Sequence, residues 1–289
     1  MDARREHRLG LFFVTAAAIT WSSAGFFTRL MNLDYPTMIA GRGIFGALGM
    51  LLLIITMDPR HWRNQFRKMG WADLAYVLNY VFGTTCYISS LGLTSIAHNS
   101  VIFATIPFIS ALLGWIFLSE IPSRNAVGAS AIAMVGVAIM VGFGMDGGLS
   151  GDILSLGATS SMAASIILVR RYRHIAIIPG ACIASFVSGL LPLPLAHDLP
   201  HVTAANFILL ILFGLLNAAP GLTLFSLGSK RLPAVETALI STLDTPLAPL
   251  WVWIAFNETA GRQTLIGGVM VLAAVFIHIG LSQRQVKAA

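Results

Sequence analysis

The chain has 289 residues, of which 56% are hydrophobic and only 10% are charged, and its mean hydropathy is +0.81. Soluble domains carry about 25% charged residues, so this composition excludes a water-soluble globule. The net charge of +6 does not indicate nucleic-acid binding, because the basic residues occur in short clusters between apolar runs. Cys86 and Cys182 lie inside such runs, which predicts neither a disulfide framework nor a metal site.

Apolar runs of about 20 residues, the length that crosses a bilayer as a helix, recur along the whole chain. In hydrocarbon a helix satisfies its own backbone hydrogen bonds, so these runs predict helices rather than strands. The connections between them are short. We expect an all-α integral membrane protein with ten transmembrane helices, at residues 10–31, 36–57, 71–91, 95–117, 124–143, 151–170, 177–196, 206–228, 233–256 and 261–281.

The basic residues predict how this bundle lies in the membrane. If the connections alternate between the two sides, 15 of the 18 basic residues fall on the side of the N-terminus, Arg29 and Arg262 fall on the other, and Arg42 lies inside a span. Lys and Arg are enriched in cytoplasmic loops. We therefore expect a multi-pass protein of a cell membrane, with both termini in the cytoplasm; a bacterial inner membrane fits this pattern.

An internal repeat relates the two halves of the sequence. At an offset of 138 residues Glu120 matches Glu258, Arg124 matches Arg262 and Asn79 matches Asn217. At an offset of 141 Gly10 matches Gly151 and Arg29 matches Arg170. Five helices in each half would make the halves enter the membrane from opposite sides, which is a transporter architecture. We expect two inverted five-helix repeats, at residues 1–143 and 144–289.

The same positions carry a family resemblance that covers essentially the whole chain. The sequence resembles the EamA family of the drug/metabolite transporter superfamily, and within it the bacterial exporters of amino acids, including aromatic ones. The resemblance implies ten helices, a central cavity and alternating access. The residues that carry it are Trp21–Gly25, Arg42-Gly43, Phe117–Pro122, Gly128, Gly151-Asp152, Pro246, Asn257-Glu258 and Gly267-Gly268.

Asp244 is the most informative polar residue, because ionisable groups inside a membrane are costly and mark functional sites. It lies about 11 residues into the ninth span, roughly 16 Å deep. Thr237, Ser241 and Asp244 recur at helical spacing, which predicts one shared face. Asp244 could bind a substrate ammonium or take up a proton, or it could stabilise the kink at Pro246. Pro107 and Pro246 are expected to break the fourth and ninth helices, which we expect to act as gates.

Other polar and aromatic residues in the spans have two interpretations each. Arg42 could hold a substrate carboxylate, or it could pair with an acid such as Asp34 and fix helix packing. Asn79 and Asn217 could contact a polar ligand or bridge helices. Aromatic side chains could wall a substrate pocket or simply pack in the bundle. The candidate substrate-binding residues are Asp244, Asn79, Asn217, Trp21, Ser241, Arg42, Tyr80, Asn99, Phe103 and Trp251, with Tyr87 a further aromatic candidate.

Charged residues near the helix ends are expected to be structural. Glu236, close to Lys230 and Arg231, is interpreted as a solvated interface charge. His98 is also interpreted as interfacial. Glu120 and Glu258 are expected to pair with Arg124 and Arg262 four residues on.

The function predicted from these features is secondary active transport of small metabolites, with export of amino acids as the first candidate. Uptake or exchange of another metabolite or of a drug-like amine is the alternative. No Walker A loop is present to hold a nucleotide, so the energy would come from a gradient, with protons as a candidate coupling ion. The sequence has no catalytic cluster that would indicate an intramembrane enzyme, and no repeated pore-lining charges that would indicate a channel. We expect no cofactor, a lipid environment, and a monomer or weak homodimer.

Overall fold

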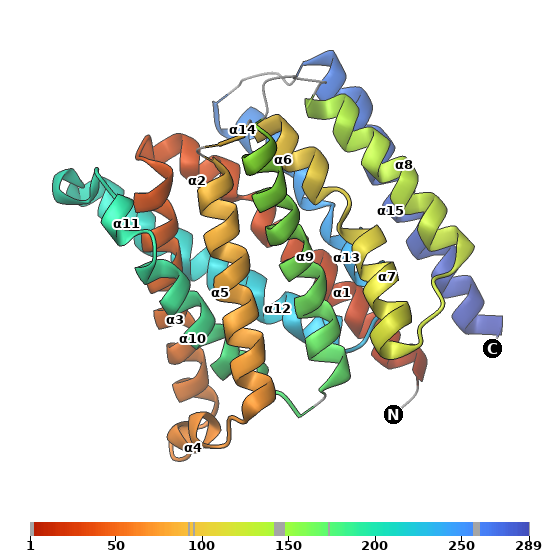
Figure 1. The fold of residues 1–289 in the computed structure, drawn as a ribbon, viewed down its shortest axis with the longest axis horizontal. Helices are drawn as coiled ribbons and strands as arrows, with labels where there is room; N and C mark the ends of the chain where they lie inside the picture. Colours follow the sequence, from red (N-terminus) through yellow and green to blue (C-terminus); the bar gives the residue numbers. More distant parts are fainter. Residues whose placement is uncertain are drawn as a thin grey trace.

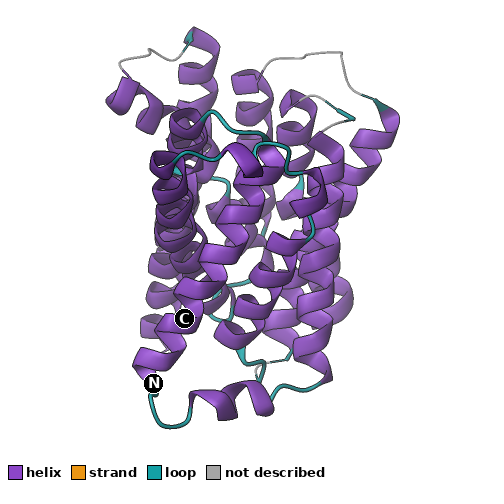
Figure 2. Cartoon of the chain, turned by 90° about the vertical axis from the view of Figure 1, so that its left-hand side faces the viewer, coloured by secondary structure: helices purple, strands orange, loops and turns teal. Residues whose placement is uncertain are grey.

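The computed structural model describes residues 3–91, 93, 94, 96–141, 148–172, 174–256 and 261–288. Throughout this part of the chain the regular structure is helical (Figure 2). The apolar runs form these helices because each backbone N–H finds its acceptor one turn back, which leaves only side chains to face lipid.

Five rods, some made of two helices in series, form the first half of the bundle. They are α1 (Ala3–Ser22) with α2 (Ala24–Met31), α3 (Tyr35–Met57), α5 (Trp71–Leu91), α6 (Ile96–Phe103) with α7 (Ile106–Leu118), and α8 (Arg124–Val141). The short helix α4 (Trp62–Arg67) lies in the connection between α3 and α5.

Five further rods form the second half. They are α9 (Leu149–Arg171), α10 (Ile177–Leu190), α11 (Ala204–Phe213) continuing through the π-helical turn η3 (Gly214–Ala218) into α12 (Ala219–Ser229), α13 (Ala234–Ser241) with α14 (Asp244–Phe256), and α15 (Arg262–Ala288). Two short 3₁₀ turns, η1 (Leu193–Leu195) and η2 (Leu199–His201), follow α10.

Nine rods in the described part are long and apolar enough to cross a membrane. The tenth, α5, has 21 residues and is more polar because it carries an aspartate, an asparagine and three tyrosines. It packs against α9 and α10 within the bundle. The prediction of ten helical spans is therefore confirmed.

The two halves run in opposite directions. Figure 1 shows both chain termini at one end of the bundle, which we call the terminal end; α1 begins there, whereas α9 begins at the opposite end. Helices at equivalent places in the two halves pack on each other, α3 on α10 and α8 on α15, and the contact of α5 with α9 is matched by that of α12 with α1. The inverted five-helix repeat is confirmed, while the predicted division between residues 143 and 144 lies outside the described residues.

Glycines allow the equivalent helices to approach closely. A Cβ atom added at Gly43 of α3 would lie 2.6 Å from the Cα of Gly189 in α10. At Gly136 of α8, a Cβ would lie 2.8 Å from the carbonyl oxygen of Gly267 in α15. Any side chain at these positions would force the backbones apart, so small residues define both contacts.

Two rods break where a threonine precedes a proline. Between α6 and α7 the Thr105 hydroxyl donates to the Ile102 carbonyl at 2.6 Å, and between α13 and α14 the Thr242 hydroxyl donates to the Leu239 carbonyl at 2.7 Å. Pro107 and Pro246 follow and have no N–H for the preceding turn. These breaks were predicted from the prolines and are confirmed; that they act as gates stays a prediction.

Two further irregularities were not predicted from the sequence. The first rod breaks at Ser23, whose hydroxyl donates to the Thr20 carbonyl at 2.7 Å. The eighth rod contains the π-helical turn η3, directly before Pro220 in the first turn of α12. The extra residue of a π turn accommodates the missing N–H of a proline, and such turns are frequent at functional sites. Pro220 was the available signal for this turn.

Candidate substrate site

Asp244 lies at the start of a half-helix inside the bundle. It is the first residue of α14, directly after the break that follows α13. The N-terminal end of a helix carries partial positive charge and unpaired N–H groups, which stabilise a carboxylate there. Thr245 donates its hydroxyl to Asp244 Oδ1 at 3.1 Å, and Thr245 is the only side chain bonded to this carboxyl among the described residues. A carboxylate without a cationic partner is therefore placed near the midpoint of the rod.

The predicted face shared by Thr237, Ser241 and Asp244 stays a prediction. The helix ends at Ser241 and a new one begins at Asp244. The Thr237 hydroxyl donates to the Pro233 carbonyl at 3.0 Å, and that of Ser241 donates to the Ala238 carbonyl at 2.7 Å. Both hydroxyls donate to their own helix, and Ser241 is only 5% exposed.

Tyrosines of α5 lie near the charged residues of α14 and α3. Tyr87 is within electrostatic range of both Asp244 and Arg42, and Tyr80 is within range of Arg42. Phe103 of α6 packs edge-on against Tyr87, with 5.5 Å between the ring centroids. Four different rods therefore place polar and aromatic groups around one region.

The polar groups of this region keep accessible surface. Tyr80 and Asp244 are partly buried, and Tyr87 is 38% exposed. Together Asp244, Arg42, Tyr80, Tyr87 and Phe103 define what we call the central site.

Two tryptophans lie beside the break in the first rod. Trp251 of α14 donates its indole N–H to the Ser22 hydroxyl at 2.8 Å. Trp21 packs on Phe225, with 5.0 Å between the ring centroids, and its indole N–H is buried without an acceptor among the described residues. Buried indole N–H groups normally find a partner, so Trp21 has an unused donor.

Arg42 does not pair with Asp34, so that predicted alternative is wrong. Its Nε donates to Asn217 Oδ1 at 3.0 Å, and its guanidinium carbon lies 5.5 Å from the centroid of the Phe213 ring. The terminal amino groups of Arg42 have no hydrogen-bond partner within the described part of the chain. They can therefore hold a carboxylate that reaches the central site.

Asp34 instead caps the start of α3. Its carboxylate accepts hydrogen bonds from the backbone N–H of Thr37 at 2.6 Å and of Asp198 at 3.0 Å. Partial burial acts to raise the pKa of Asp34, but the hydrogen bonds from Thr37 and Asp198 outweigh it and leave the pKa below its ordinary value. This residue joins the start of α3 to the connection after α10.

The repeat-related asparagines both bridge helices. Asn79 donates from Nδ2 to the Ser161 carbonyl at 2.9 Å and to the Ser165 hydroxyl at 2.8 Å. Asn217, in the π-helical turn, donates to the Thr20 carbonyl at 2.8 Å and accepts from Arg42. Of the two predicted roles, the geometry favours bridging for Asn79, whereas Asn217 also orients a residue of the central site.

Asn99 lies away from Asp244 in contact with the end of α5. It is 4% exposed, donates to the Ser90 hydroxyl at 3.2 Å, and has a buried Oδ1 with no partner in the described part of the chain. Its predicted role in binding substrate stays a prediction.

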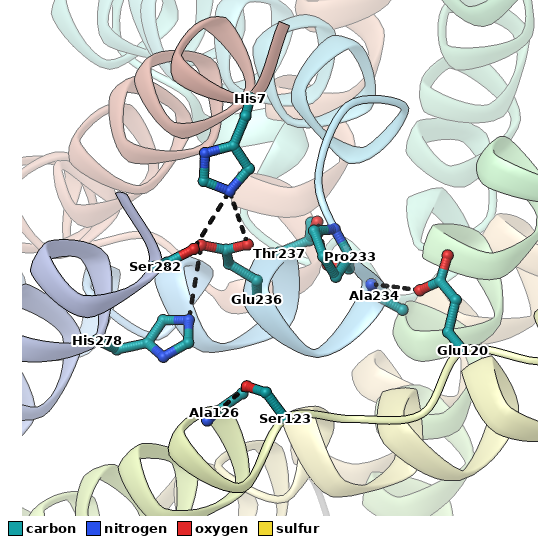
Figure 3. A network of polar contacts seen from close by, with 10 residues as sticks. All are labelled: His7, Glu120, Ser123, Ala126, Pro233, Ala234, Glu236, Thr237, His278 and Ser282. Carbon is teal, nitrogen blue, oxygen red and sulfur yellow. Dashed lines mark hydrogen bonds and ion pairs between the residues drawn. The ribbon is translucent and has the colours of Figure 1, made fainter. Parts of the chain in front are cut away.

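The predictions for two glutamates near helix ends are wrong. Glu120 pairs with Arg170 of α9 rather than with Arg124, and its other oxygen accepts from the Ala234 N–H at 3.2 Å. Glu236 is not solvated; it is 4% exposed and contacts His7 of α1 (Figure 3). The predicted Glu258–Arg262 pair and the His98 side chain lie outside the described residues.

Sequence reasoning missed the histidines around Glu236. His7 Nε2 lies 3.1 Å from Glu236 Oε2, and His278 Nε2 of α15 lies 3.6 Å from Glu236 Oε1. The signal available in the sequence was a histidine 17 residues into the last predicted helix, followed by an apolar turn. Its partner comes from 42 positions earlier in the chain, so spacing could not identify it.

Comparisons with known proteins agree with this architecture. The model of the EamA-like transporter family matches residues 8–142 and 149–280, one match in each half. A solved crystal structure matches 94% of this chain and 98% of its own with a TM-score of 0.81 at 14% identity, which shows a shared fold. No curated protein matches the sequence. Because the family model covers nearly the whole length, the chain belongs to the EamA-like transporter family and is a multi-pass membrane transporter of small molecules.

Proposed function

We propose that the protein is a secondary active transporter that exports amino acids, aromatic ones among them, by alternating access around the central site. The substrate ammonium binds Asp244, and the substrate carboxylate binds the terminal amino groups of Arg42. The side chain of the substrate lies against Tyr80, Tyr87 and Phe103.

The observation that carries this proposal is the partly buried Asp244 carboxylate at the break in the ninth rod, which has no cationic partner among the described residues. A buried charge without a partner is unfavourable unless a counter-charge or a proton neutralises it. A substrate ammonium supplies the counter-charge while substrate is bound, and a proton supplies it while the site is empty. The same residue therefore couples proton movement to substrate movement in opposite directions.

The zwitterionic substrate follows from the opposite charges that line the site. Tyr87 lies within electrostatic range of both Asp244 and Arg42, so an amino acid between them can satisfy both charges. The aromatic rings supply apolar surface for the rest of the molecule, as in other small-molecule sites.

Alternating access is supported by the broken rods. Half-helices that begin near the midplane are the usual binding elements of inverted-repeat transporters, and α14 begins at Asp244. The basic clusters predict that both termini lie in the cytoplasm. A bacterial inner membrane as the location, and a monomer or weak homodimer as the assembly, complete the proposal.

A carrier of drug-like amines is the second candidate. Arg42 already donates to Asn217 and lies against the Phe213 ring, so it could act only as a structural residue. Asp244 alone would then select cationic amines, without a requirement for a carboxylate.

A counterflow screen in proteoliposomes tests the proposal. Purified protein is assayed with trapped amino acids, amines or purines, and the uptake of the matching radiolabelled compound is measured. We expect amino acids to drive counterflow in the wild type, and Asp244→Asn to abolish proton-coupled flux without reducing the folded yield. Asp58→Asn, at the exposed end of α3, is the matched control. Stimulation by amines but not by amino acids would favour the second candidate, and unchanged flux in Asp244→Asn would exclude the role of this carboxylate.

A further inference from the structure

A second group of buried ionisable side chains lies at the terminal end of the bundle, away from the central site. Figure 3 shows Glu236, near the start of α13, between His7 of α1 and His278 of α15. The side chains of Glu236 and His278 are each 5% exposed and that of His7 is 12% exposed. We call these three residues the terminal cluster.

One edge of the terminal cluster is hydrogen-bonded and the other is not. His7 Nε2 lies 3.1 Å from Glu236 Oε2 and 3.3 Å from the Ser282 hydroxyl. On the other edge, Glu236 Oε1 and both ring nitrogens of His278 are buried without a hydrogen-bond partner among the described residues. His278 Nε2 and Glu236 Oε1 nevertheless lie 3.6 Å apart. Two buried groups that face each other at this distance form an ion pair once the imidazole is protonated.

Charge balance indicates that the terminal cluster holds one proton beyond its neutral imidazoles. A buried carboxylate with two neutral histidines leaves an uncompensated negative charge, which is strongly unfavourable. One imidazolium neutralises Glu236, and a second would leave a net positive charge. Imidazole is the side chain best suited to carry an exchangeable proton near neutral pH, and the terminal cluster has two of them.

The neighbouring charged groups do not supply that balance. Within the described chain, Glu6 pairs with Arg231 and Glu120 pairs with Arg170. Arg8 and Arg124 are exposed to solvent. Among the described residues, the charged residues on or directly after the helices packed on α13 at this end also include Arg5, Arg171 and Lys230.

The terminal cluster also closes one end of the bundle. Glu236 joins α13 to α1 and α15, while Glu120 accepts from the first N–H of α13 and joins it to α7 and α9. The start of α13 is thus attached to four neighbouring helices at the terminal end. The same rod continues, after its break, into α14 and Asp244.

From these observations we infer that His7, Glu236 and His278 form a proton-binding site that holds the terminal end of the transport pathway closed while a proton is bound. The inference rests on the proposed function, since it assigns a second site for the coupling proton of that transporter. Proton release leaves Glu236 without a counter-charge, and the start of α13 then separates from α1 and α15.

Hydrogen–deuterium exchange of α13 tests the inference without any substrate. The protein is placed in lipid nanodiscs, and exchange of the backbone amides of residues 234–241 is followed by mass spectrometry from pH 5.5 to 8.5. Rates are corrected for the intrinsic pH dependence of exchange. Because one proton stabilises the closed form, protection in the wild type is highest at low pH. It falls as the pH rises, by up to about tenfold per pH unit, the limit for one linked proton.

Matched variants separate this effect from a general loss of structure. His278→Gln and Glu236→Gln are expected to make the corrected protection independent of pH, whereas His61→Gln, an exposed histidine beside Asp58, is expected to keep the wild-type dependence. If either buried variant does not fold, His7→Gln at the more exposed edge replaces it, and its pH dependence should also be lost.

Corrected protection that does not change with pH in the wild type, or that keeps its full pH dependence in His278→Gln, would overturn the inference. This outcome is distinct from failure of the proposed function, which is judged by flux through Asp244→Asn and not by exchange in α13.

Discussion

The two rods that break near a proline, α6–α7 and α13–α14, occupy equivalent places in the two halves but carry different side chains at the break. Each break has a threonine hydroxyl bonded to the carbonyl three residues earlier. In the first half the next helix begins at Ile106, which is 5% exposed; in the second it begins at Asp244. The broken backbone is therefore common to both halves, while the charge that can bind a ligand belongs to only one of them.

The largest expected difference between the two breaks is in transport. Asp244→Asn should reduce flux at least about 100-fold, equivalent to ~2.7 kcal/mol, because it removes the only carboxylate of the central site. The equivalent change at the other break, Thr105→Val, removes one local hydrogen bond and should leave flux within about threefold. Both are measured by proteoliposome counterflow. Equal losses in the two variants would mean that the breaks, and not the charge, set the rate.

The next effect in size concerns stability, through the contacts that Glu120 makes with Arg170 and with the first residue of α13. Glu120→Gln should destabilise the protein by about 2 kcal/mol, because it leaves Arg170 without its counter-ion and weakens the bond to the Ala234 N–H. This value allows for partial solvent screening, since the Glu120 side chain is 30% exposed. Reversible unfolding in mixed detergent measures the change. Asp58→Asn, which affects only an exposed contact with His61, should be neutral, and a neutral Glu120→Gln would contradict the anchoring role.

Unlike the change at Asp244, replacing the proline should affect transport equally at the two breaks. Pro107→Ala and Pro246→Ala each restore an N–H that can extend the helix across the break. Each should slow flux about tenfold, or ~1.4 kcal/mol, if both rods move in alternating access. Pro59→Ala, in the exposed connection after α3, is the control and should have no effect. A loss in only one of the two variants would show that only one rod moves.

The smallest effects are expected for the paired asparagines. Interhelical hydrogen bonds in membranes contribute about 0.6 kcal/mol on average and up to about 1.7. Asn217→Ala removes hydrogen bonds to Thr20, Ser23 and Arg42. Asn79→Ala removes hydrogen bonds only to Ser161 and Ser165. Asn217→Ala should therefore lower the free energy of unfolding more than Asn79→Ala. Equilibrium unfolding of both variants gives the order, and the reverse order would contradict the hydrogen bonds observed at the π-helical turn.

Much of the fold could be predicted because it depends on local patterns. The apolar runs and basic clusters predict the rods closely; for example, the span expected at 36–57 is Tyr35–Met57 in the structure. The prolines likewise predict two of the breaks. The break at Ser23 and the π-helical turn were not predicted, because the contacts there join distant segments: Asn217 of the turn donates to the Thr20 carbonyl and to the Ser23 hydroxyl.

The site was predicted less well because its contacts join distant segments. Glu236 was assigned to solvent from its neighbours Lys230 and Arg231, but those side chains bond elsewhere, to the Ile175 carbonyl and to Glu6. Arg42 was expected near Asp34, eight positions away, and instead reaches Asn217. Asp244 could be singled out because a lone acid in an apolar run is unusual whatever its contacts.

The most direct test of the central claim, that Asp244 binds the ammonium of an amino acid, compares two trapped compounds in counterflow. Phenylalanine and 3-phenylpropionate share the ring and the carboxylate, and only phenylalanine has the ammonium. With radiolabelled phenylalanine as tracer, we expect trapped phenylalanine to drive uptake in the wild type and 3-phenylpropionate to have no effect. Equal stimulation by the two compounds would show that the ammonium is not recognised and would contradict the account.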